Sequence, residues 1–376
     1  MRLACVYRRL AREGGTEGDL YRTSEALAAR GHDVHLFCSD LRTPPPAGVS
    51  VHRVPLVRAG RLARLVSFAW AAPRVVARAG PWDVVVGFGR TPGQDLARCG
   101  GGTHRAYLAT MQAFGARRRV LGPYHRAVLG IEAMQYRAGN FRRVLAVSRR
   151  VRAELMAGYG VAADRVHVVY NGVDLARFHP RRARELRPAA RRKLGIPADA
   201  RIVLMVGSGF RRKNVDGLLR LWLDAPPLDA WLVIVGGDER LGAYRRAAAA
   251  PRLRGRVIFT GPQAAVEEFY AAADAVAVAS LQEAFGNVVL EALASGKAVV
   301  TSSAVGAAEL LAGSLRELIA DRPDDLRGFH DRLTLVLRED GSEIGRLARR
   351  VAEERPWAAH FDALERVLEE TAAASP

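Results

Sequence analysis

The stretch SLQEAFGNVVLEALASGKAVV, residues 280–300, contains a turn, a helix-like apolar run and a strand-like run in succession. Two carboxylates, Glu283 and Glu291, lie on either side of its Ala-Phe-Gly turn. Gly286 and Asn287 open the helical run, and the free N–H groups and the dipole of a helix N-terminus favour an anion. The stretch therefore predicts part of an α/β fold, with a phosphate or pyrophosphate site where the helix begins. Taken singly, either acid could equally be a helix-cap or solvated residue.

The same alternation of β-branched runs, Gly-rich turns and amphipathic helices recurs along the chain and predicts parallel sheets with helical crossovers. The strand runs are nearly continuous in Val, Ile and Ala, which suits strands covered on both faces. Helices are expected near residues 19–30, 61–79 and 149–159. The expected strands begin at Leu3, Val34, Asp83, Arg143, Val166, Ile202, Trp231, Val257, Ala275 and Lys297.

The length of 376 residues suits two domains. The segment from Asn171 to Ala200 is rich in charge and carries Pro180, Pro188 and Pro197, so it predicts an inter-domain connector with a short helix and a boundary near Pro180. Residues 1–180 and 181–355 are each expected to form a Rossmann-like, doubly wound unit. Such units bind ligands at the carboxyl ends of their strands, so the two are expected to face each other across a ligand-binding cleft.

The composition excludes several classes of protein. Three cysteines, Cys5, Cys38 and Cys99, are far apart and have no metal-binding spacing, so they are expected to be free thiols in a reducing compartment. The N-terminus lacks the apolar region of a signal peptide, and no apolar run approaches the roughly 20 residues of a spanning helix. These features predict a soluble, cytoplasmic protein.

The formal net charge of +18 is carried almost entirely by arginine. An arginine bias of the whole genome would explain this without function. The charge is nevertheless uneven, because residues 116–152 hold ten arginines and a single acid, Glu132. Such a patch would attract nucleic acid, anionic lipid or a phosphorylated substrate. Both explanations stay open at the level of sequence.

The segment GSGFRRKNVDGL, residues 207–218, directly follows an expected strand. Ser208 and Gly209 supply a flexible turn at the carboxyl end of that strand. Arg212 and Lys213 then place two cations before a helix, where they could neutralise a diphosphate as it becomes a leaving group. The alternative is an ordinary solvated basic turn.

Two glycine-rich loops follow expected strands in the first half. In REGGTEGDLYR, Gly15 permits close approach to a ligand and Asp19 lies in the first helical turn, yet the loop matches neither a dinucleotide nor a Walker fingerprint. The second loop is expected over residues 87–108, where a run of three glycines, residues 100–102, precedes His104. This histidine could hydrogen-bond a sugar hydroxyl or hold a proton, or it could be a surface residue beside a turn.

No D-x-D motif and no metal-ligand cluster occurs, so neither a metal nor a cofactor is expected. EAFGNVVLE, residues 283–291, resembles the E-x7-E signature of the family 4 retaining glycosyltransferases of GT-B fold. In matching order, GGTEGD, VVYNGVDLARFHP, GSGFRRKNVDGL and FTGPQ resemble further segments of that family. VGFGRTPGQD, residues 86–95, is similar to its lipopolysaccharide core glucosyltransferases. The resemblance spans the whole chain.

The resemblance implies metal-independent transfer of a hexose, with retention, from a nucleoside-diphosphate sugar to a bacterial surface glycan such as lipopolysaccharide core. UDP is the family's default nucleotide, and the donor is a co-substrate and not a cofactor. The residues implied in catalysis are Glu283, His104, Lys213 and Arg212. Those implied in donor binding are Gly15, Thr16, Asp19, Gly209, Arg212, Lys213, Pro262, Phe285, Gly286, Asn287, Val288 and Glu291.

Individual roles are also implied by the resemblance. Arg212 and Lys213 would hold the diphosphate, Glu283 the hydroxyls of the transferred sugar, and Glu291 the ribose. Residues 1–180 would form the acceptor side and residues 181–355 the nucleotide-sugar domain, with residues 356–376 crossing back to the first domain. The core glucosyltransferases carry an acid where this chain has Gly101, and His104 is assigned to the acceptor side of the cleft.

The patch from Arg117 to Arg152 is expected to contact an anionic glycan or glycolipid acceptor, or anionic lipid on the inner face of the plasma membrane. Each charge near such a surface contributes about 1 kcal/mol. Nucleic acid is not an expected partner, because the basic stretches lack interleaved aromatic residues and no recognised motif occurs. Two alternatives remain, a basic nucleic-acid-binding α/β protein and a GT-B nucleotide-sugar epimerase or hydrolase.

Overall fold

The computed structural model describes residues 1–115, 122–253, 255–338 and 342–374. The chain divides into two compact units: unit 1 is Met1–Tyr170 with His360–Pro376, and unit 2 is Asn171–Ala359. The division thus falls after Tyr170, whereas the sequence analysis placed it near Pro180. The reason is helix α6 (Pro180–Leu194), which forms in the segment where a short helix was expected but packs on α9 (Val266–Ala272) and so belongs to unit 2.

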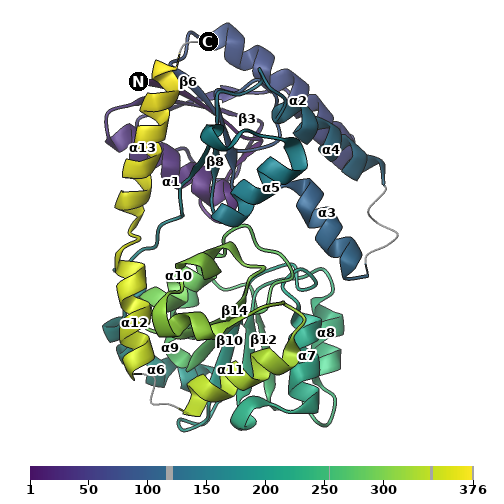
Figure 1. Ribbon diagram of the computed structural model, residues 1–376, viewed down its shortest axis with the longest axis vertical. Coiled ribbons are helices and arrows are strands. Elements are labelled where there is room, and N and C mark those ends of the chain that lie inside the picture. The colour runs from purple at the N-terminus through teal and green to yellow at the C-terminus, as the bar shows by residue number, and fades with distance from the viewer. Residues whose placement is uncertain (116–121, 254, 339–341, 375–376) are drawn as a thin grey trace. The chain divides into compact units, whose positions relative to one another are not determined.

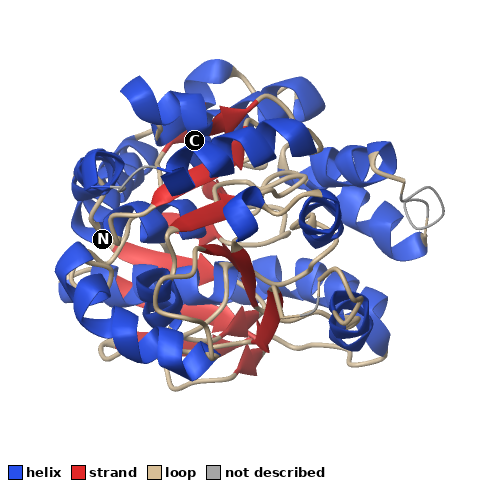
Figure 2. Cartoon of the chain, turned by 90° about the horizontal axis from the view of Figure 1, so that it is seen from below, coloured by secondary structure: helices blue, strands red, loops and turns tan. Residues whose placement is uncertain are grey.

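Among the described residues, unit 1 contains a seven-stranded sheet whose pairs are all parallel, in the order β5-β3-β1-β6-β7-β8-β9. Helices lie on both sides of the strands (Figures 1 and 2). The strands are β1 (Arg2–Val6), β3 (Asp33–Cys38), β5 (Val49–Arg53), β6 (Val84–Gly87), β7 (Leu96–Cys99), β8 (Arg143–Ala146) and β9 (Val166–Val168), with a short pair β2 (Arg9–Leu10) and β4 (Asp40–Leu41). The helices are α1 (Thr16–Ala29), α2 (Gly60–Ala79), α3 (His104–Ala113), α4 (Pro123–Gln135), α5 (Arg149–Tyr159), the 3-10 turn η1 (Ala163–Arg165), and most of α13 (Trp357–Ala373).

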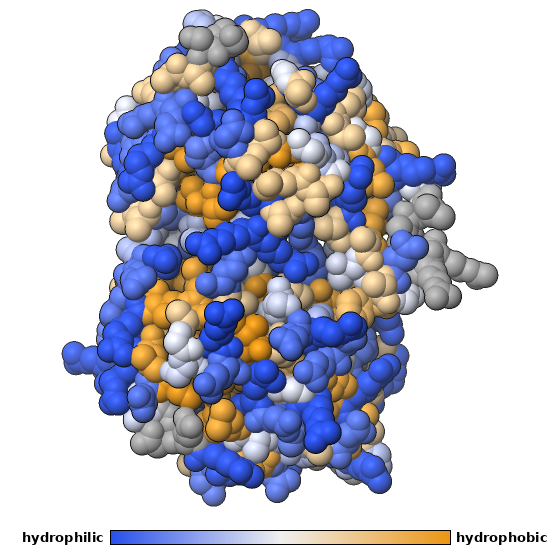
Figure 3. Space-filling view, viewed as in Figure 1, coloured by the Kyte–Doolittle hydropathy of each residue, from blue (hydrophilic) through white to orange (hydrophobic). Residues whose placement is uncertain are grey.

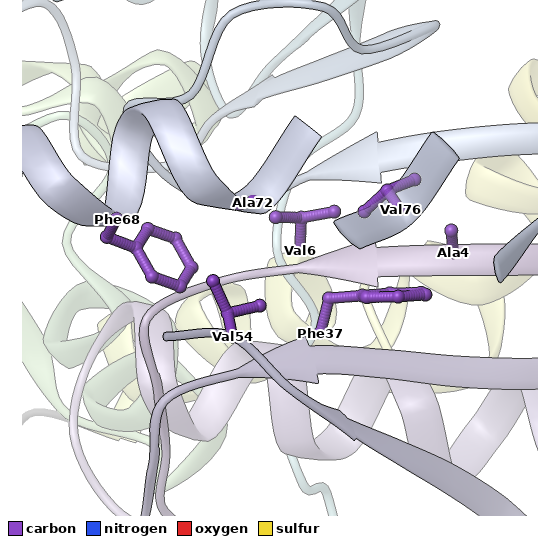
Figure 4. Close-up of a cluster of buried hydrophobic side chains, with 7 residues drawn as sticks. All are labelled: Ala4, Val6, Phe37, Val54, Phe68, Ala72 and Val76. Atoms are coloured by element: carbon purple, nitrogen blue, oxygen red, sulfur yellow. The ribbon is translucent and has the colours of Figure 1, made fainter. Parts of the chain in front are cut away.

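The core of unit 1 explains why α2 forms where the periodicity predicts it. Phe68, Ala72 and Val76 recur every four residues and therefore share one face of the helix. That face packs against side chains of β1 and β3, among them Val6 and Phe37, in the cluster shown in Figure 4. Burial of this face, at about 25 cal/mol per Å² of apolar surface, holds α2 on the sheet.

Unit 2 is a second parallel sheet, with six strands among the described residues in the order β12-β11-β10-β13-β14-β15. Its strands are β10 (Ile202–Val206), β11 (Trp231–Val235), β12 (Val257–Gly261), β13 (Ala275–Val278), β14 (Ala298–Ser302) and β15 (Ile319–Ala320). Besides α6 and α9, its helices are α7 (Val215–Asp224), α8 (Leu241–Ala248), α10 (Asn287–Ala294), α11 (Leu326–Arg338) and α12 (Ser342–Glu353), with 3-10 turns η2 (Pro227–Asp229), η3 (Gly306–Leu310) and η4 (Gly313–Leu318). The expected fold class of two Rossmann-like units is confirmed.

One segment of unit 1 differs from its expected form. Residues 87–108 were expected to be a loop, but they contain strand β7 and the start of α3. The sequence LARC reads poorly as a buried strand because of its arginine. In the structure Arg98 is buried all the same, since its guanidinium pairs with the carboxylate of Asp19.

Candidate functional site

The predicted residues of unit 2 lie where the strand order of its sheet reverses. β10 and β13 are neighbours, and the chain runs from β10 to β11 on one side and from β13 to β14 on the other. Ligands of open α/β sheets bind at the carboxyl ends of strands at such a reversal. The segments that hold Arg212, Lys213 and Glu283 leave these two strand ends.

A cluster of two cations and one carboxylate forms at this position. The Nη1 of Arg212 and the Nζ of Lys213 each lie 2.5 Å from Oε2 of Glu283. The side chain of Lys213 is 8% exposed, that of Glu283 17% and that of Arg212 31%. The three groups together carry one net positive charge and face partly outward, which suits them to an anionic ligand.

The ionisation of Glu283 depends on these cations. Burial alone would raise the pKa of the carboxyl, but the charges and hydrogen bonds of Lys213 and Arg212 outweigh burial and lower the pKa. The group is therefore a carboxylate, which accepts hydrogen bonds. Within the described part of the chain its Oε1 has no hydrogen-bond partner, so that oxygen is available to a hydroxyl group of a ligand.

The backbone around Lys213 permits this arrangement only with glycine. Gly207 has a φ of +146°, and a Cβ at this residue would lie 2.5 Å from Cε of Lys213. A Cβ on Gly236 would lie 2.1 Å from the carbonyl oxygen of Gly207. The lysine stem thus crosses directly over bare backbone at the end of β10. Sequence reasoning singled out the neighbouring Gly209 and missed Gly207.

Backbone hydrogen bonds fix the two loops to each other and to the rest of unit 2. The N–H of Leu281 donates to the carbonyl of Arg212 at 2.8 Å, and the N–H of Gly209 donates to Gly237 at 3.0 Å. The N–H of Glu283 donates to Ala304 at 3.0 Å, so the segment that carries the carboxylate extends as a short parallel bridge. The cluster is therefore held in place before any ligand binds.

The first turn of α10 lies next to this cluster. Its N-cap, Gly286, has a φ of +99°, which favours glycine. The preceding Phe285 is only 2% exposed and anchors the turn. Asn287 begins the helix, and its side-chain oxygen accepts a hydrogen bond of 2.8 Å from Asn171. The amides of Asn287 and Val288 belong to the first turn, whose N–H groups have no acceptor within the helix.

The remaining predicted residues of unit 2 occupy the edges of this region. Oε2 of Glu291 accepts a hydrogen bond of 2.7 Å from the hydroxyl of Tyr270, which fixes the direction of the carboxylate. Burial raises the pKa of that tyrosine well above its usual value. Pro262 follows β12, and its Cγ lies 3.2 Å from where a Cβ of Gly237 would be. The structure thus brings all the predicted residues of unit 2 to one end of its sheet.

Unit 1 has a cavity of about 410 Å³ at the corresponding end of its own sheet, where β1, β6 and β7 finish. Its lining combines arginine side chains, aromatic rings and bare glycine backbone. The lining residues include Arg8, Arg9, Arg61, Arg64, Arg90 and Tyr124. Apart from Thr16, none of the lining residues was singled out by name as a site residue in the sequence analysis, because arginines are abundant throughout this chain and carry no local pattern.

The charges in this cavity are only partly balanced. Arg9 lies 3.2 Å from Asp40, and the guanidinium of Arg61 lies 4.5 Å from the ring centroid of Tyr124. Arg8 and Arg64 form no ion pair with any residue that the structure describes. A cavity with surplus guanidinium groups and a ring suits a ligand that is both anionic and built on a flat or ring-shaped body.

Three residues predicted to bind the donor belong to unit 1. Gly15 is the N-cap of α1 and Thr16 is the first residue of that helix, where Thr16 lines the cavity. Asp19 is 6% exposed and pairs with Arg98, which is 4% exposed. Asp19 therefore serves a buried ion pair and is not among the residues that line the cavity.

The expectation that His104 is a surface residue is wrong, whereas its role on the acceptor side of the cleft stays a prediction. It is neither a surface residue nor a lining residue of the cavity, but a buried residue at the start of α3. Its Nε2 lies 2.9 Å from Nδ1 of His125. Burial, with the charges of Arg90 and His125, lowers the pKa of His104 to about 4. The imidazole is therefore neutral near neutral pH.

Glu132, which was noticed only as the single acid of the basic segment, is central to this region. It is 3% exposed and accepts hydrogen bonds from the backbone N–H of His104, at 2.8 and 2.9 Å, and from that of Arg105 at 3.3 Å. The hydroxyl of Tyr159 also donates to it. Glu132 thus caps the N-terminus of α3 with a full negative charge. An isolated acid among arginines was the only signal in the sequence.

Part of the segment Arg117–Arg152, residues 117–119 included, lies outside the described residues. Of the rest, several arginines have acidic partners from other parts of unit 1. Arg142 lies 3.1 Å from Asp95, and Arg143 lies 3.5 Å from Glu370. These pairs neutralise some of the charge that the sequence analysis assigned to an external partner, and the contact with lipid or acceptor stays a prediction.

Among the residues described, no group of three or more His, Cys, Asp or Glu side chains is placed to hold a metal ion. The three cysteines are buried and free.

No helix in the described ranges combines the length and apolar character needed to cross a membrane. Hydrophilic side chains cover much of the outline of each unit on the face shown in Figure 3.

Comparison with known proteins matches two family models to the chain. The model described as "Glycosyltransferase Family 4" matches residues 13–177, and that described as "Glycosyl transferases group 1" matches residues 187–354. The chain is 27% identical over 304 residues to the lipopolysaccharide glucosyltransferase WaaG of Escherichia coli K12, covering 80% of this chain and 79% of that protein. It is 31% identical over 274 residues to a probable transglycosylase of Burkholderia thailandensis, covering 72% and 68%.

Solved structures show the same fold. A crystal structure of WaaG superposes with a TM-score of 0.82 at 22% identity, covering 99% of this chain and 100% of that one. The structure of HepE from Anabaena in complex with UDP and glucose superposes with a TM-score of 0.71 at 21% identity, covering 98% and 100%. Both likenesses extend over the two units.

Proposed function

The chain belongs to family 4 of the glycosyltransferases with the GT-B fold, and from this we propose that it moves a hexose from a nucleoside-diphosphate sugar to an anionic glycan acceptor, with retention of configuration. The observation that carries the proposal is the Arg212–Lys213–Glu283 cluster beside the first turn of α10. It joins a net positive charge, a carboxylate oxygen and helix amides within one strand-end region. UDP is the proposed nucleotide, and the UDP-bound HepE is a structural relative.

Each group has a distinct role in the proposal. The first-turn amides of α10 and the two cations bind the diphosphate and stabilise the charge that grows on it as the bond to the sugar breaks. Oε1 of Glu283 accepts a hydrogen bond from a hydroxyl of the sugar. Glu291, oriented by Tyr270, accepts hydrogen bonds from the ribose. No metal ion is assigned a part, because these groups supply the positive charge.

The proposed reaction needs no protein nucleophile. The bond between the anomeric carbon and the phosphate oxygen breaks, the acceptor oxygen bonds to the same face of that carbon, and the acceptor proton passes to the departing phosphate oxygen. A glycosidase of the retaining class instead places two carboxyl groups about 5–5.5 Å apart, one of them as nucleophile. Glu283 is held by two cations, so it positions groups and does not attack the sugar.

The cavity of unit 1 is the proposed acceptor site. Its arginines, Arg8, Arg61 and Arg64 among them, favour a phosphorylated or carboxylated sugar over a neutral one. The name of the relative WaaG gives lipopolysaccharide as its substrate, and the core of a bacterial lipopolysaccharide is the proposed acceptor class.

Transfer assays with radiolabelled UDP-glucose and a panel of phosphorylated and dephosphorylated core glycans test this function. We expect label to appear in the phosphorylated glycan with retained configuration. Free glucose without acceptor product would indicate a hydrolase, and an altered sugar on the nucleotide would indicate an epimerase. Either result would overturn the proposal.

A further inference from the structure

A second cavity of unit 2 lies away from the Arg212–Lys213–Glu283 cluster. Its volume is about 650 Å³, within the usual range of small-molecule pockets. Helices α6 and α12 border it together with the C-terminal end of α10, and all three lie on the same side of unit 2 in Figure 1. α10 has eight residues. It begins beside the candidate donor site and ends at this cavity, so the two sites are separate.

The lining of this cavity is strongly cationic. Among the residues that the structure describes, twelve line it, of which six are arginine or lysine and none is acidic. Arg184 and Arg187 lie three residues apart on α6, and Arg346, Arg349 and Arg350 lie at helical spacing on α12, so each set shares one face of its helix. The sixth cation is Lys297, directly before β14.

Three of these cations are engaged by the protein and form the wall. Arg187 pairs with Asp274, Arg349 lies 2.8 Å from Glu353 and also donates to the carbonyl of Ala294, and Lys297 donates to Ala273 at 2.8 Å. These contacts fix the helices that border the cavity. They also show that the carboxylates of Asp274 and Glu353 are already paired.

The other three cations, Arg184, Arg346 and Arg350, are exposed and form no ion pair with any residue in the described part of the chain. All three line the cavity and remain accessible to a ligand. Like charges at this density repel one another, and a bound anion offsets the repulsion. In the wall of the cavity, burial and the charge of Arg187 lower the pKa of Lys297 to about 8.

We propose that this cavity binds a compact phosphate-bearing anion through Arg184, Arg346 and Arg350. A guanidinium group presents its N–H donors in a fork that matches phosphate oxygens, and here three such groups meet at one concave site. The ligand is either a soluble polyphosphate-type molecule or the phosphate head group of a single lipid, because a cavity of about 650 Å³ accommodates a small group.

Isothermal titration of the full chain with inorganic tripolyphosphate tests the proposal. Arg346→Glu combined with Arg350→Glu should weaken binding by roughly tenfold or more, since two charge-assisted contacts are lost. A matched control, Arg220→Glu with Arg338→Glu, makes the same change of charge at exposed positions on α7 and α11, outside this cavity, and should bind like the unaltered chain. Binding of tripolyphosphate at the Arg212–Lys213 cluster should change to the same extent in both pairs of substitutions.

A second arm distinguishes the source of the phosphate. Co-sedimentation is measured with vesicles of phosphatidylcholine alone and of phosphatidylcholine with phosphatidylglycerol. If Arg346→Glu/Arg350→Glu loses tripolyphosphate binding and the control pair keeps it, the ligand is a soluble molecule. If Arg346→Glu/Arg350→Glu loses vesicle binding and the control pair keeps it, the ligand is a lipid head group. Equal behaviour of both variant pairs in both arms would overturn the proposal. The milder pair Arg346→Gln/Arg350→Gln replaces the first variant if circular dichroism shows that it is unfolded.

Discussion

Glu283 in unit 2 and Glu132 in unit 1 are both carboxylates with little exposure, but they bind different kinds of partner. Glu283 lies 2.5 Å from each of two side-chain cations, Arg212 and Lys213. Glu132 instead accepts hydrogen bonds from backbone amides of α3 and from Tyr159, and its one cation partner among the described residues, Arg90, lies 4.0 Å away. Side-chain cations can shift to a substrate phosphate, but the amides of a helix start cannot move without unwinding the helix. Burial of an acid alone therefore does not mark a catalytic position. The groups that contact the carboxylate distinguish a binding role from a structural one.

The largest effect that would sharpen this comparison comes from Lys213→Ala. Removal of a cation that stabilises the departing diphosphate should lower kcat/KM for glycosyl transfer by about 10² to 10³-fold, in line with the loss of one preorganised stabilising group. Steady-state kinetics with UDP-glucose measure it. Lys193→Ala removes a surface lysine that pairs with Glu268, and should leave kcat/KM within about twofold. Equal effects of the two changes would refute the assignment.

Next in size is the effect of the acceptor arginines of unit 1. Arg61→Ala with Arg64→Ala should raise the KM for a phosphorylated acceptor by roughly 10 to 100-fold, because charge-assisted contacts are lost, with the KM for the donor unchanged. Arg74→Ala with Arg78→Ala, further along α2 and outside the cavity, is the matched control. If the KM for the donor changes and that for the acceptor does not, the cavity is not the acceptor site.

A smaller effect is expected for Glu132→Gln, and it should concern stability. The change removes the charge that caps α3 and weakens several hydrogen bonds, so the free energy of unfolding should fall by about 1–3 kcal/mol. Urea denaturation measures this. Turnover per folded molecule should stay near that of the unaltered protein at a temperature well below the transition. A loss of turnover of the size expected for Lys213→Ala would instead make Glu132 a catalytic residue.

The smallest effect concerns the pH dependence of His104. Its folded pKa of about 4 lies below the ordinary value of 6.5, so the unfolded state binds the proton more readily. Stability should therefore be unaffected by this residue above about pH 6.5 and should fall as the pH drops from there toward 4. Burial also lowers the pKa of His360 to about 4, so this residue adds to the same loss of stability toward low pH. His104→Gln should flatten the slope of Tm against pH in this window; a ring titration of His104 near pH 6.5 by NMR would contradict the account.

The contrast also shows which parts of the molecule could be predicted from sequence. The strands and the cluster of unit 2 were predictable, because Arg212, Lys213 and Glu283 stand directly after strongly apolar runs whose carboxyl ends meet. The buried charges of unit 1 could not be predicted, because Arg98 and Glu132 are buried through contacts with partners far away in the sequence. Nothing local distinguishes them from the solvated charges of the same chain.

The glycines divide in the same way. Gly286 could be identified from its place between a turn and a helix. Gly207 could not, because its requirement comes from the stem of Lys213 passing over it, a contact that no spacing rule encodes. Similarly, α6 was expected to be a connector since its composition is polar and proline-rich, yet Arg187 and Arg191 tie it to Asp274 within unit 2.

We propose above all that the Arg212–Lys213–Glu283 cluster holds a nucleoside-diphosphate sugar without a divalent ion. Isothermal titration of UDP-glucose in the presence of EDTA measures this directly, with the unaltered chain, Lys213→Ala and Lys193→Ala compared. The account predicts binding by the unaltered chain and by Lys193→Ala, and binding weaker by roughly tenfold or more for Lys213→Ala. Binding of equal strength in all three proteins, or binding that appears only when a divalent ion is added, would contradict it.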